Sequence, residues 1–143
     1  MFIGEYQHNL DEKGRLSMPV KFRAKMAGGA VVTKGLDNCL SVYTVEEWEK
    51  LAEKLASLPI TNSASRAFAR LMLAGATQVN IDKQGRVTLP AYLREYAGLQ
   101  GPAVVAGLFS RVEIWSVDNW RSYKSNTEGD ASVIAEELEN LGI

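Results

Sequence analysis

The sequence contains an internal repeat, and this repeat limits the chain to folds built from two similar units. Residues 4–23 align with residues 75–94 at an offset of 71, and eight of the twenty aligned positions are identical. A second block, residues 35–48, aligns with residues 107–120 at an offset of 72. Two blocks in nearly one register indicate a duplication, and repeated units commonly bury their apolar faces against each other.

Each copy predicts the same order of strand, tight turn, strand and short helix. A first strand is expected to end at Asp11 or Asp82, and a glycine in each turn allows a positive φ. In the next strand, alternation places Leu16 on the inner face and Arg15 and Ser17 on the outer face, with Arg86 and Thr88 outward in the second copy. Pro19 and Pro90 favour the starts of helices at 20–26 and 91–97. Further strands are expected at 30–33, 39–43, 103–106 and 111–115.

The segments outside these repeats predict helices. Residues 45–58 carry a one-sided apolar stripe. Ser63 is a favourable N-cap for a helix at 64–74, whose second half is apolar nearly all round. A polar connector at 125–130 is expected to precede a last helix. The predicted organisation is therefore a first module at 5–47, connecting helices at 48–75, a second module at 76–119 and a C-terminal helical tail at 120–143.

Composition excludes several classes of protein. Hydrophobic residues make up 46% of the chain and charged residues 23%, which is typical of a globular protein. Cys39 is the only cysteine, so no internal disulfide forms, and this fits a reducing compartment. The first ten residues lack the pattern of a signal peptide, and no apolar stretch approaches the ~18–20 residues of a membrane span. We therefore expect a soluble cytoplasmic protein.

The net charge of −1 argues at first against a nucleic-acid partner, but the charges are unevenly placed. Residues 9–34 carry two acids and six bases, a net of +4, whereas residues 118–143 carry six acids and two bases, a net of −4. A local field of this kind can steer a phosphate backbone to one face. A solvated surface of mixed charge explains the same pattern, and charge alone favours this simpler interpretation.

Catalytic motifs are missing from the sequence. The only histidine, His8, aligns with Val79, and Cys39 aligns with Arg111, so neither is expected to be a catalytic or metal-binding residue. Each aspartate that might act as one of two paired acids has its own arginine four residues later. We therefore predict that the chain is not an enzyme and has no cofactor and no metal site.

The most informative element is Asp-x-x-Gly-Arg, at residues 11–15 and again at 82–86. In the structural interpretation, the aspartate caps the turn and pairs with the arginine. In the functional interpretation, it also fixes a guanidinium that can present its planar fork to the O6 and N7 of guanine or to phosphate. The residues alone support both about equally.

Candidate DNA-binding residues follow from the functional interpretation: Asp11, Lys13, Arg15, Asp82, Lys83 and Arg86. Supporting basic residues near these turns are Lys21, Arg23, Lys25 and Arg94. Some of them are expected to face phosphate. For Arg23 and Arg94, which occupy equivalent positions on the two short helices, bracing the barrel is the structural alternative.

The two motifs resemble the signatures of a known family. AsnLeuAspGluLysGlyArgLeuSerMetPro at 9–19 and AsnIleAspLysGlnGlyArgValThrLeuPro at 80–90 resemble those of the MraZ family, and the resemblance covers nearly the whole chain. It implies an α+β, mainly β fold. Two tandem SpoVT/AbrB-type modules, of the swapped-hairpin or double-psi barrel kind, would form one pseudo-symmetric unit with added helices.

The resemblance also implies a function. Members of the family regulate transcription of the bacterial division and cell-wall gene cluster, often of their own operon, by binding short G-rich direct repeats in double-stranded promoter DNA. The implied location is the cytoplasm, in association with the nucleoid. A rival hypothesis is an interaction protein, such as an antitoxin-like module or scaffold, against which the second module and the regular helices argue.

A ring-shaped homo-oligomer, octameric or larger, is a further implication of the resemblance. The apolar faces of the connecting helices are the surface that such a ring would bury. The same helices would alternatively pack on their own barrel in a monomer. The candidate oligomerisation residues are Trp48, Leu51, Leu55, Leu71 and Met72.

Overall fold

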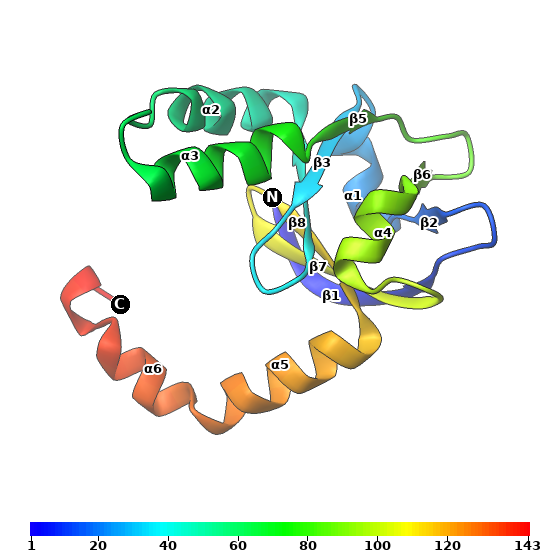
Figure 1. Ribbon diagram of the computed structural model, residues 1–143. Helices are drawn as coiled ribbons and strands as arrows, with labels where there is room; N and C mark the ends of the chain where they lie inside the picture. Colours follow the sequence, from blue (N-terminus) through cyan, green and yellow to red (C-terminus); the bar gives the residue numbers. More distant parts are fainter.

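The structure is a computed structural model that describes residues 1–143 and has the predicted α+β fold (Figure 1). The strands are β1 (Phe2–Asn9), β2 (Arg15–Ser17), β3 (Ala30–Lys34), β4 (Leu40–Thr44), β5 (Thr77–Val79), β6 (Arg86–Thr88), β7 (Pro102–Phe109) and β8 (Val112–Ser116). The α-helices are α1 (Val20–Arg23), α2 (Val45–Ala56), α3 (Ser63–Ala69), α4 (Ala91–Ala97), α5 (Val117–Gly129) and α6 (Ala131–Glu137). Short 3₁₀ segments follow α1 (Ala24–Met26) and α6 (Glu139–Leu141), and a π-helical segment follows α3 (Arg70–Ala74).

The two modules exchange strands and so form one folding unit. Six antiparallel strands make one sheet in the order β1-β7-β8-β4-β3-β5. Strand β1 of the first module pairs with β7 of the second, and β5 of the second pairs with β3 of the first. Strands β4 and β8 pair at the centre of the sheet. Each pairing has a counterpart when the modules are interchanged, which confirms the predicted pseudo-symmetric unit of two swapped modules.

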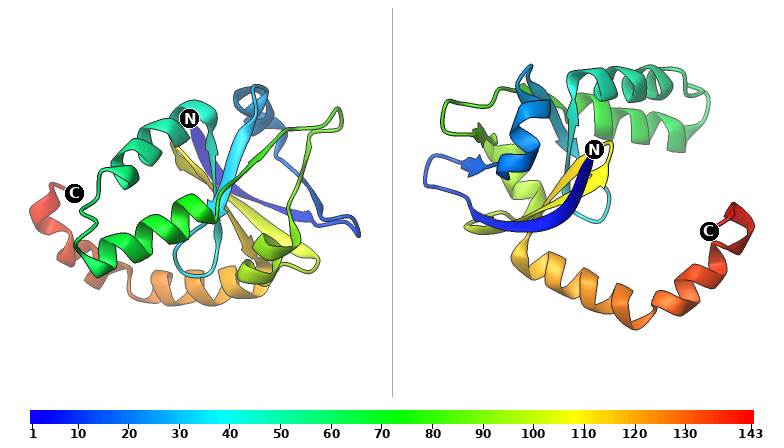
Figure 2. Two further views of the ribbon diagram at one scale, coloured as in Figure 1. Left: turned by 45° about the horizontal axis from the view of Figure 1, so that its top comes forward. Right: turned by 180° about the vertical axis from the view of Figure 1, so that it is seen from behind.

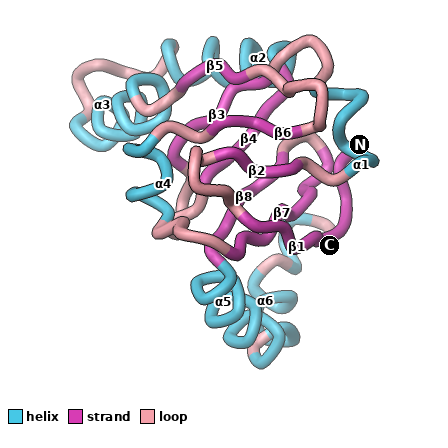
Figure 3. The backbone as a smooth tube through the Cα atoms, turned by 90° about the vertical axis from the view of Figure 1, so that its right-hand side faces the viewer, coloured by secondary structure: helices cyan, strands magenta, loops and turns pink.

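A separate two-stranded ribbon joins the modules on another side of the molecule. Strands β2 and β6 pair antiparallel with the register Arg15↔Thr88, Leu16↔Val87 and Ser17↔Arg86, and they lie side by side in Figure 3. The ribbon continues in two equivalent backbone hydrogen bonds. The amide of Met18 donates to the carbonyl of Gly85 at 2.9 Å, and the amide of Leu89 donates to the carbonyl of Gly14 at 2.8 Å.

Both modules contribute to one hydrophobic core. Leu16, Met18, Val87 and Leu89 follow the alternation of the two ribbon strands, and all four are fully buried. They belong to a cluster of 20 buried residues that draws on both copies of the repeat. Since burial of apolar side chains is the main stabilising contribution, neither module keeps its core without the other.

Helices α2 and α5 begin in the same way, as the repeat predicts. The side chain of Thr44 accepts a hydrogen bond from the amide of Glu47 at 3.2 Å, and that of Ser116 accepts one from Asn119 at 3.1 Å. Hydroxyl side chains at this position satisfy amides that lack a partner in the first helical turn. The helices start before residues 48 and 120, so each begins inside its predicted module.

Several predicted local details are wrong. The N-cap of α3 is Asn62, whose Oδ1 accepts from the amide of Ser65 at 2.9 Å, and Ser63 is the first helical residue. The first strand ends at Asn9, because Asp11 already belongs to the following turn. The polar segment 125–130 is not a connector, since α5 continues to Gly129.

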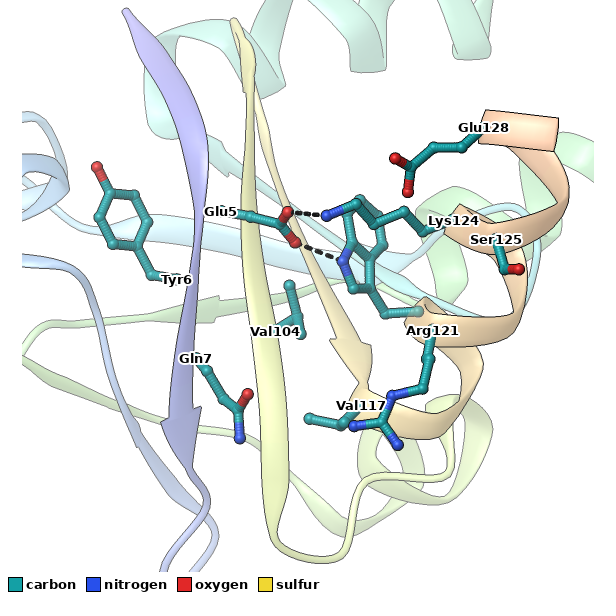
Figure 4. A pocket seen from close by; sticks show the side chains of 10 residues that line it. Glu5, Tyr6, Gln7, Val104, Val117, Arg121, Lys124, Ser125 and Glu128 are labelled. Atoms are coloured by element: carbon teal, nitrogen blue, oxygen red, sulfur yellow. Dashed lines mark hydrogen bonds and ion pairs between the residues drawn. The ribbon is translucent and has the colours of Figure 1, made fainter. Parts of the chain in front are cut away.

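Helix α5 is held against β1 by polar and aromatic contacts. A carboxylate oxygen of Glu5 accepts from Trp120 Nε1 at 2.5 Å, and the other accepts from Lys124 Nζ (Figure 4). The hydrogen bond from Lys124 is the main reason that the pKa of Glu5 lies below its usual value. The rings of Trp115 and Trp120 also meet edge-on at 5.4 Å. These contacts explain why a polar sequence remains helical at this place.

Helices α2, α3, α5 and α6 lie away from the ribbon, whereas α1 and α4 lie beside it (Figure 1). Helices α2 and α3 run side by side on one flank of the sheet, and α5 and α6 extend along the opposite flank (Figures 1 and 2). No residue of α6 is buried. None of the helices combines the length and the apolar composition that crossing a membrane requires.

Candidate nucleic-acid interface

Each Asp-x-x-Gly-Arg element forms a closed turn that fixes an arginine. In the first copy, Oδ1 of Asp11 accepts from the backbone amides of Lys13 and Arg15, both at 2.9 Å. Its Oδ2 accepts from Arg15 Nε at 2.6 Å. The amide of Gly14 donates to the carbonyl of Asp11 at 3.0 Å, and the φ of Gly14 is +77°. A glycine is therefore needed there, since other residues rarely adopt that conformation.

The second copy repeats this geometry. Oδ1 of Asp82 accepts from the amides of Gln84 and Arg86, both at 2.9 Å, and Oδ2 accepts from Arg86 Nε at 2.8 Å. The φ of Gly85 is +78°. Two turns with the same hydrogen bonds thus present two arginines in equivalent poses. The structural interpretation of the motif, in which the aspartate caps the turn and pairs with the arginine, describes both turns.

The pairing leaves the outer edge of each guanidinium available. Only Nε of Arg15 and of Arg86 donates to the neighbouring aspartate, and neither terminal Nη group donates to any acceptor in the chain. The two side chains keep 30% and 25% of their surface exposed. A guanidinium held through Nε still has the fork of Nη donors that matches guanine or phosphate oxygens.

The aspartates remain charged at neutral pH. The backbone amide of the paired arginine is the largest cause that lowers the pKa of Asp11 and Asp82, and the guanidinium lowers it further. A carboxyl whose pKa falls on folding stabilises the fold above its unfolded pKa of about 3.9, and this contribution disappears as the pH falls through the folded value. The poses of both arginines are therefore insensitive to pH in the physiological range.

The predicted basic residues lie in two different settings. Lys13 and Lys83 are exposed in the two turns, and Lys21 and Lys25 are exposed on α1 and the 3₁₀ segment after it. The aspartates and arginines of the two motifs lie in the same turns as Lys13 and Lys83. The paired strands β2 and β6, which follow these turns, hold the two turns together. The structure thus brings the six candidate DNA-binding residues to one side of the molecule.

Arg23 and Arg94 each lie against the turn glycine of the other module, Gly85 and Gly14 respectively. Arg23 Nε donates to the carbonyl of Met18 at 2.9 Å, and Arg94 Nε donates to that of Leu89 at 3.0 Å. The guanidinium of Arg23 also lies so close to Gly85, in the other module, that a Cβ on this glycine would come within 2.2 Å of Nε. This geometry favours the bracing role for both arginines.

Replacing Arg23 by alanine is expected to lower the melting temperature, because a hydrogen bond and a contact between modules are lost together. The expected loss is about 1–2 kcal/mol, from an ordinary hydrogen bond and the packing of the arginine stem. Lys21→Ala, on the exposed side of the same helix, is the matched control and should change the melting temperature little. Equal melting temperatures for both variants would contradict the bracing role.

The remaining reactive groups form no second site. Cys39 is buried, and burial is the main cause that raises the pKa of its thiol to about 12, so it is a poor nucleophile. His8 lies in β1, and no group of three or more histidine, cysteine, aspartate or glutamate side chains is placed to hold a metal ion.

The candidate oligomerisation residues differ in exposure. Leu55 and Met72 are 4% and 5% exposed, so they pack inside their own chain and are not available to a second copy. Trp48, Leu51 and Leu71 are half-buried. Larger apolar exposure occurs nearby at Ile60, at 80%, and on α3 at Phe68, at 36%, neither of which the sequence had singled out.

The fold and the two turns define the class of protein to which the chain belongs. The chain is a tandem pair of swapped β modules in which a shared ribbon presents two aspartate-fixed arginines. A family model described as the MraZ protein and as antitoxin-like matches residues 1–71 and again 72–140.

Full-length relatives agree with this match. Proteins named transcriptional regulator MraZ from Halothermothrix orenii and Acetivibrio thermocellus are each 49% identical to the chain over 143 residues, and that from Syntrophomonas wolfei is 48% identical. Each alignment covers all of both chains. The chain therefore belongs to the MraZ family. The relatives are named as regulators and not as enzymes, which confirms the prediction that this chain is not an enzyme.

Proposed function

We propose that the chain is a DNA-binding transcriptional regulator that reads double-stranded DNA through Arg15 and Arg86. The observation that carries the proposal is the pair of equivalent arginines, each fixed through Nε by an aspartate and each with free Nη donors. The name shared by its full-length relatives supports the same function.

The fixed poses suit recognition of bases. A bidentate contact from an arginine to O6 and N7 of guanine is the commonest specific contact in the major groove. Ordering a free side chain costs about 0.5–1.5 kcal/mol on binding. Arginines that are already held by Asp11 and Asp82 avoid part of this cost, so more of the contact energy contributes to affinity.

The finer proposal concerns the target. Resemblance to the family supports binding to short G-rich direct repeats upstream of the division and cell-wall gene cluster, with control of the chain's own operon and association with the nucleoid. Two equivalent reading turns in one chain suit a repeated sequence. An electrophoretic mobility shift with DNA from upstream of its own operon tests this proposal.

The expected result is a shift of the upstream duplex that excess unrelated duplex does not compete away. Equal binding to the upstream duplex and to a shuffled duplex of the same composition would contradict it. In that case a protein partner becomes the better explanation, in agreement with the antitoxin-like description of the matching family model.

Lys13 and Lys83 are expected to contact phosphate and not bases, because both are exposed in the turns that hold the arginines. Replacing either lysine by alanine should lower affinity for all sequences about equally. The slope of the logarithm of the binding constant against that of the salt concentration should fall by about 1 for each true contact. Lys54→Ala, on the exposed side of α2, is the control, and an unchanged slope for Lys13→Ala and Lys83→Ala would assign them no phosphate contact.

We also propose self-association into a ring-shaped homo-oligomer through the helical flanks. Exposed apolar side chains on both flanks, at Ile60, Phe68, Ile134 and Leu141, support this proposal. Linking several reading turns in one particle raises avidity without new contacts. Light scattering coupled to size exclusion should find a species several times heavier than the 15.7 kDa chain. A single species of 15.7 kDa at micromolar concentration would contradict it.

A further inference from the structure

Two hydroxyl residues lie opposite the arginines on the ribbon, and their hydroxyl groups form no hydrogen bond within the chain. Arg15 pairs across the ribbon with Thr88, and Arg86 pairs with Ser17. Neither hydroxyl donates or accepts a hydrogen bond within the protein. Thr88 is exposed and Ser17 is half-buried. Both therefore retain their full capacity to bond to an external group.

The four polar side chains share one face of the ribbon. Because side chains alternate along a strand, the outward set is Arg15, Ser17, Arg86 and Thr88, while Leu16 and its partner are fully buried on the other face. Directly opposed residues have Cβ atoms about 4.5–5.5 Å apart, and diagonal neighbours are about 7–8 Å apart. Each hydroxyl residue is thus directly opposite one arginine, and the two arginines are diagonal neighbours.

We propose that the β2–β6 ribbon enters the major groove as one unit, in which Ser17 and Thr88 contact the base pairs next to those contacted by the arginines. The inference rests on the proposed DNA-binding function. The major groove is about 12 Å wide and admits a two-stranded ribbon. A diagonal of about 7–8 Å corresponds to about two base-pair steps of 3.4 Å. The ribbon lies on a different side of the molecule from the α2–α3 and α5–α6 flanks (Figures 1 and 3), and Thr88 on its outer face is exposed.

Ser17 and Thr88 also make the ribbon asymmetric, so that it can distinguish the two orientations of a DNA site. The approximate twofold symmetry of the modules exchanges Ser17 with Thr88, and only threonine carries a methyl group. A threonine methyl packs against the methyl of thymine, whereas a serine hydroxyl contacts acceptors or donors of several bases. A symmetric reader matches a palindromic site. The difference between positions 17 and 88 therefore favours sites read in one orientation, as direct repeats are.

Selection of bound duplexes from a pool of random sequence tests this inference. The variants are Thr88→Ser, which removes the methyl, Thr88→Val, which removes the hydroxyl, and Ser17→Ala. Each should weaken binding to the wild-type motif about 2- to 10-fold, the effect of one ordinary contact. Thr88→Ser should also lose preference for thymine at one base pair, and the guanine positions should remain.

The controls separate this inference from the function on which it rests. Thr61→Ser, in the exposed connection between α2 and α3, should select the wild-type motif with unchanged affinity. If all three ribbon variants also do so while Arg15→Ala loses the motif, the assignment of the hydroxyl residues is wrong and the DNA-binding function stands. If Arg15→Ala binds like the wild type as well, both fail. A thymine preference that survives in Thr88→Ser would refute the directional role.

Discussion

The double substitution of Arg15 and Arg86 by alanine is expected to remove specific DNA binding and to leave the fold intact. Each bidentate contact contributes about 1–3 kcal/mol of discrimination, so each single variant should bind its site about 5- to 150-fold more weakly. The turns should survive, because Oδ1 of Asp11 and of Asp82 bonds to backbone amides that alanine keeps. Titration of a labelled upstream duplex measures the loss.

Two comparisons make this result specific. Arg121→Ala, on the exposed side of α5, removes the same charge away from the ribbon and should bind like the wild type. Arg15→Lys keeps the charge but not the planar fork, so it should retain the salt dependence and lose discrimination between sequences. Normal specific binding by the double variant would rule out the arginines as the reading residues.

Replacing Leu16 by alanine is expected to destabilise the whole chain and not one half of it. Leu16 is fully buried at the ribbon, where the modules meet. A buried leucine shortened to alanine costs about 2–5 kcal/mol through lost burial and the cavity left behind. Urea unfolding at fixed protein concentration should show one transition at lower urea, with an unchanged slope.

The control is Leu36→Ala, whose side chain is 60% exposed and should change the unfolding free energy by less than about 0.5 kcal/mol. In variants that keep a single tryptophan, fluorescence reports on α2 through Trp48 and on the second module through Trp115. Both signals should change together in the Leu16 variant. Two separate transitions would show that the modules unfold independently, against the shared core.

The sequence by itself determined the features that depend on neighbouring residues. The repeat predicted two equivalent modules, and alternation placed Arg15 outward and Leu16 inward. The spacing of Asp-x-x-Gly-Arg predicted a glycine turn with a paired arginine, because these hydrogen bonds span at most four residues. The starts of α1 and α4 directly after prolines were also predicted, because this preference is local. The class of the protein was predicted from the resemblance of the two motifs to a known family.

Only the tertiary structure decided the features that depend on distant partners. The sequence did not specify that β1 pairs with β7, where Phe2 lies opposite Phe109, or that β2 lies against β6, since any two exposed edges offer similar backbone groups. It also predicted a connector at 125–130, whereas α5 continues to Gly129 and its preceding turns are held against Glu5 by Trp120 and Lys124. Local sequence preference determines the turns and which side chains of each strand point inward. Burial shared between the two modules determines which strands pair, and so places both arginines on one ribbon.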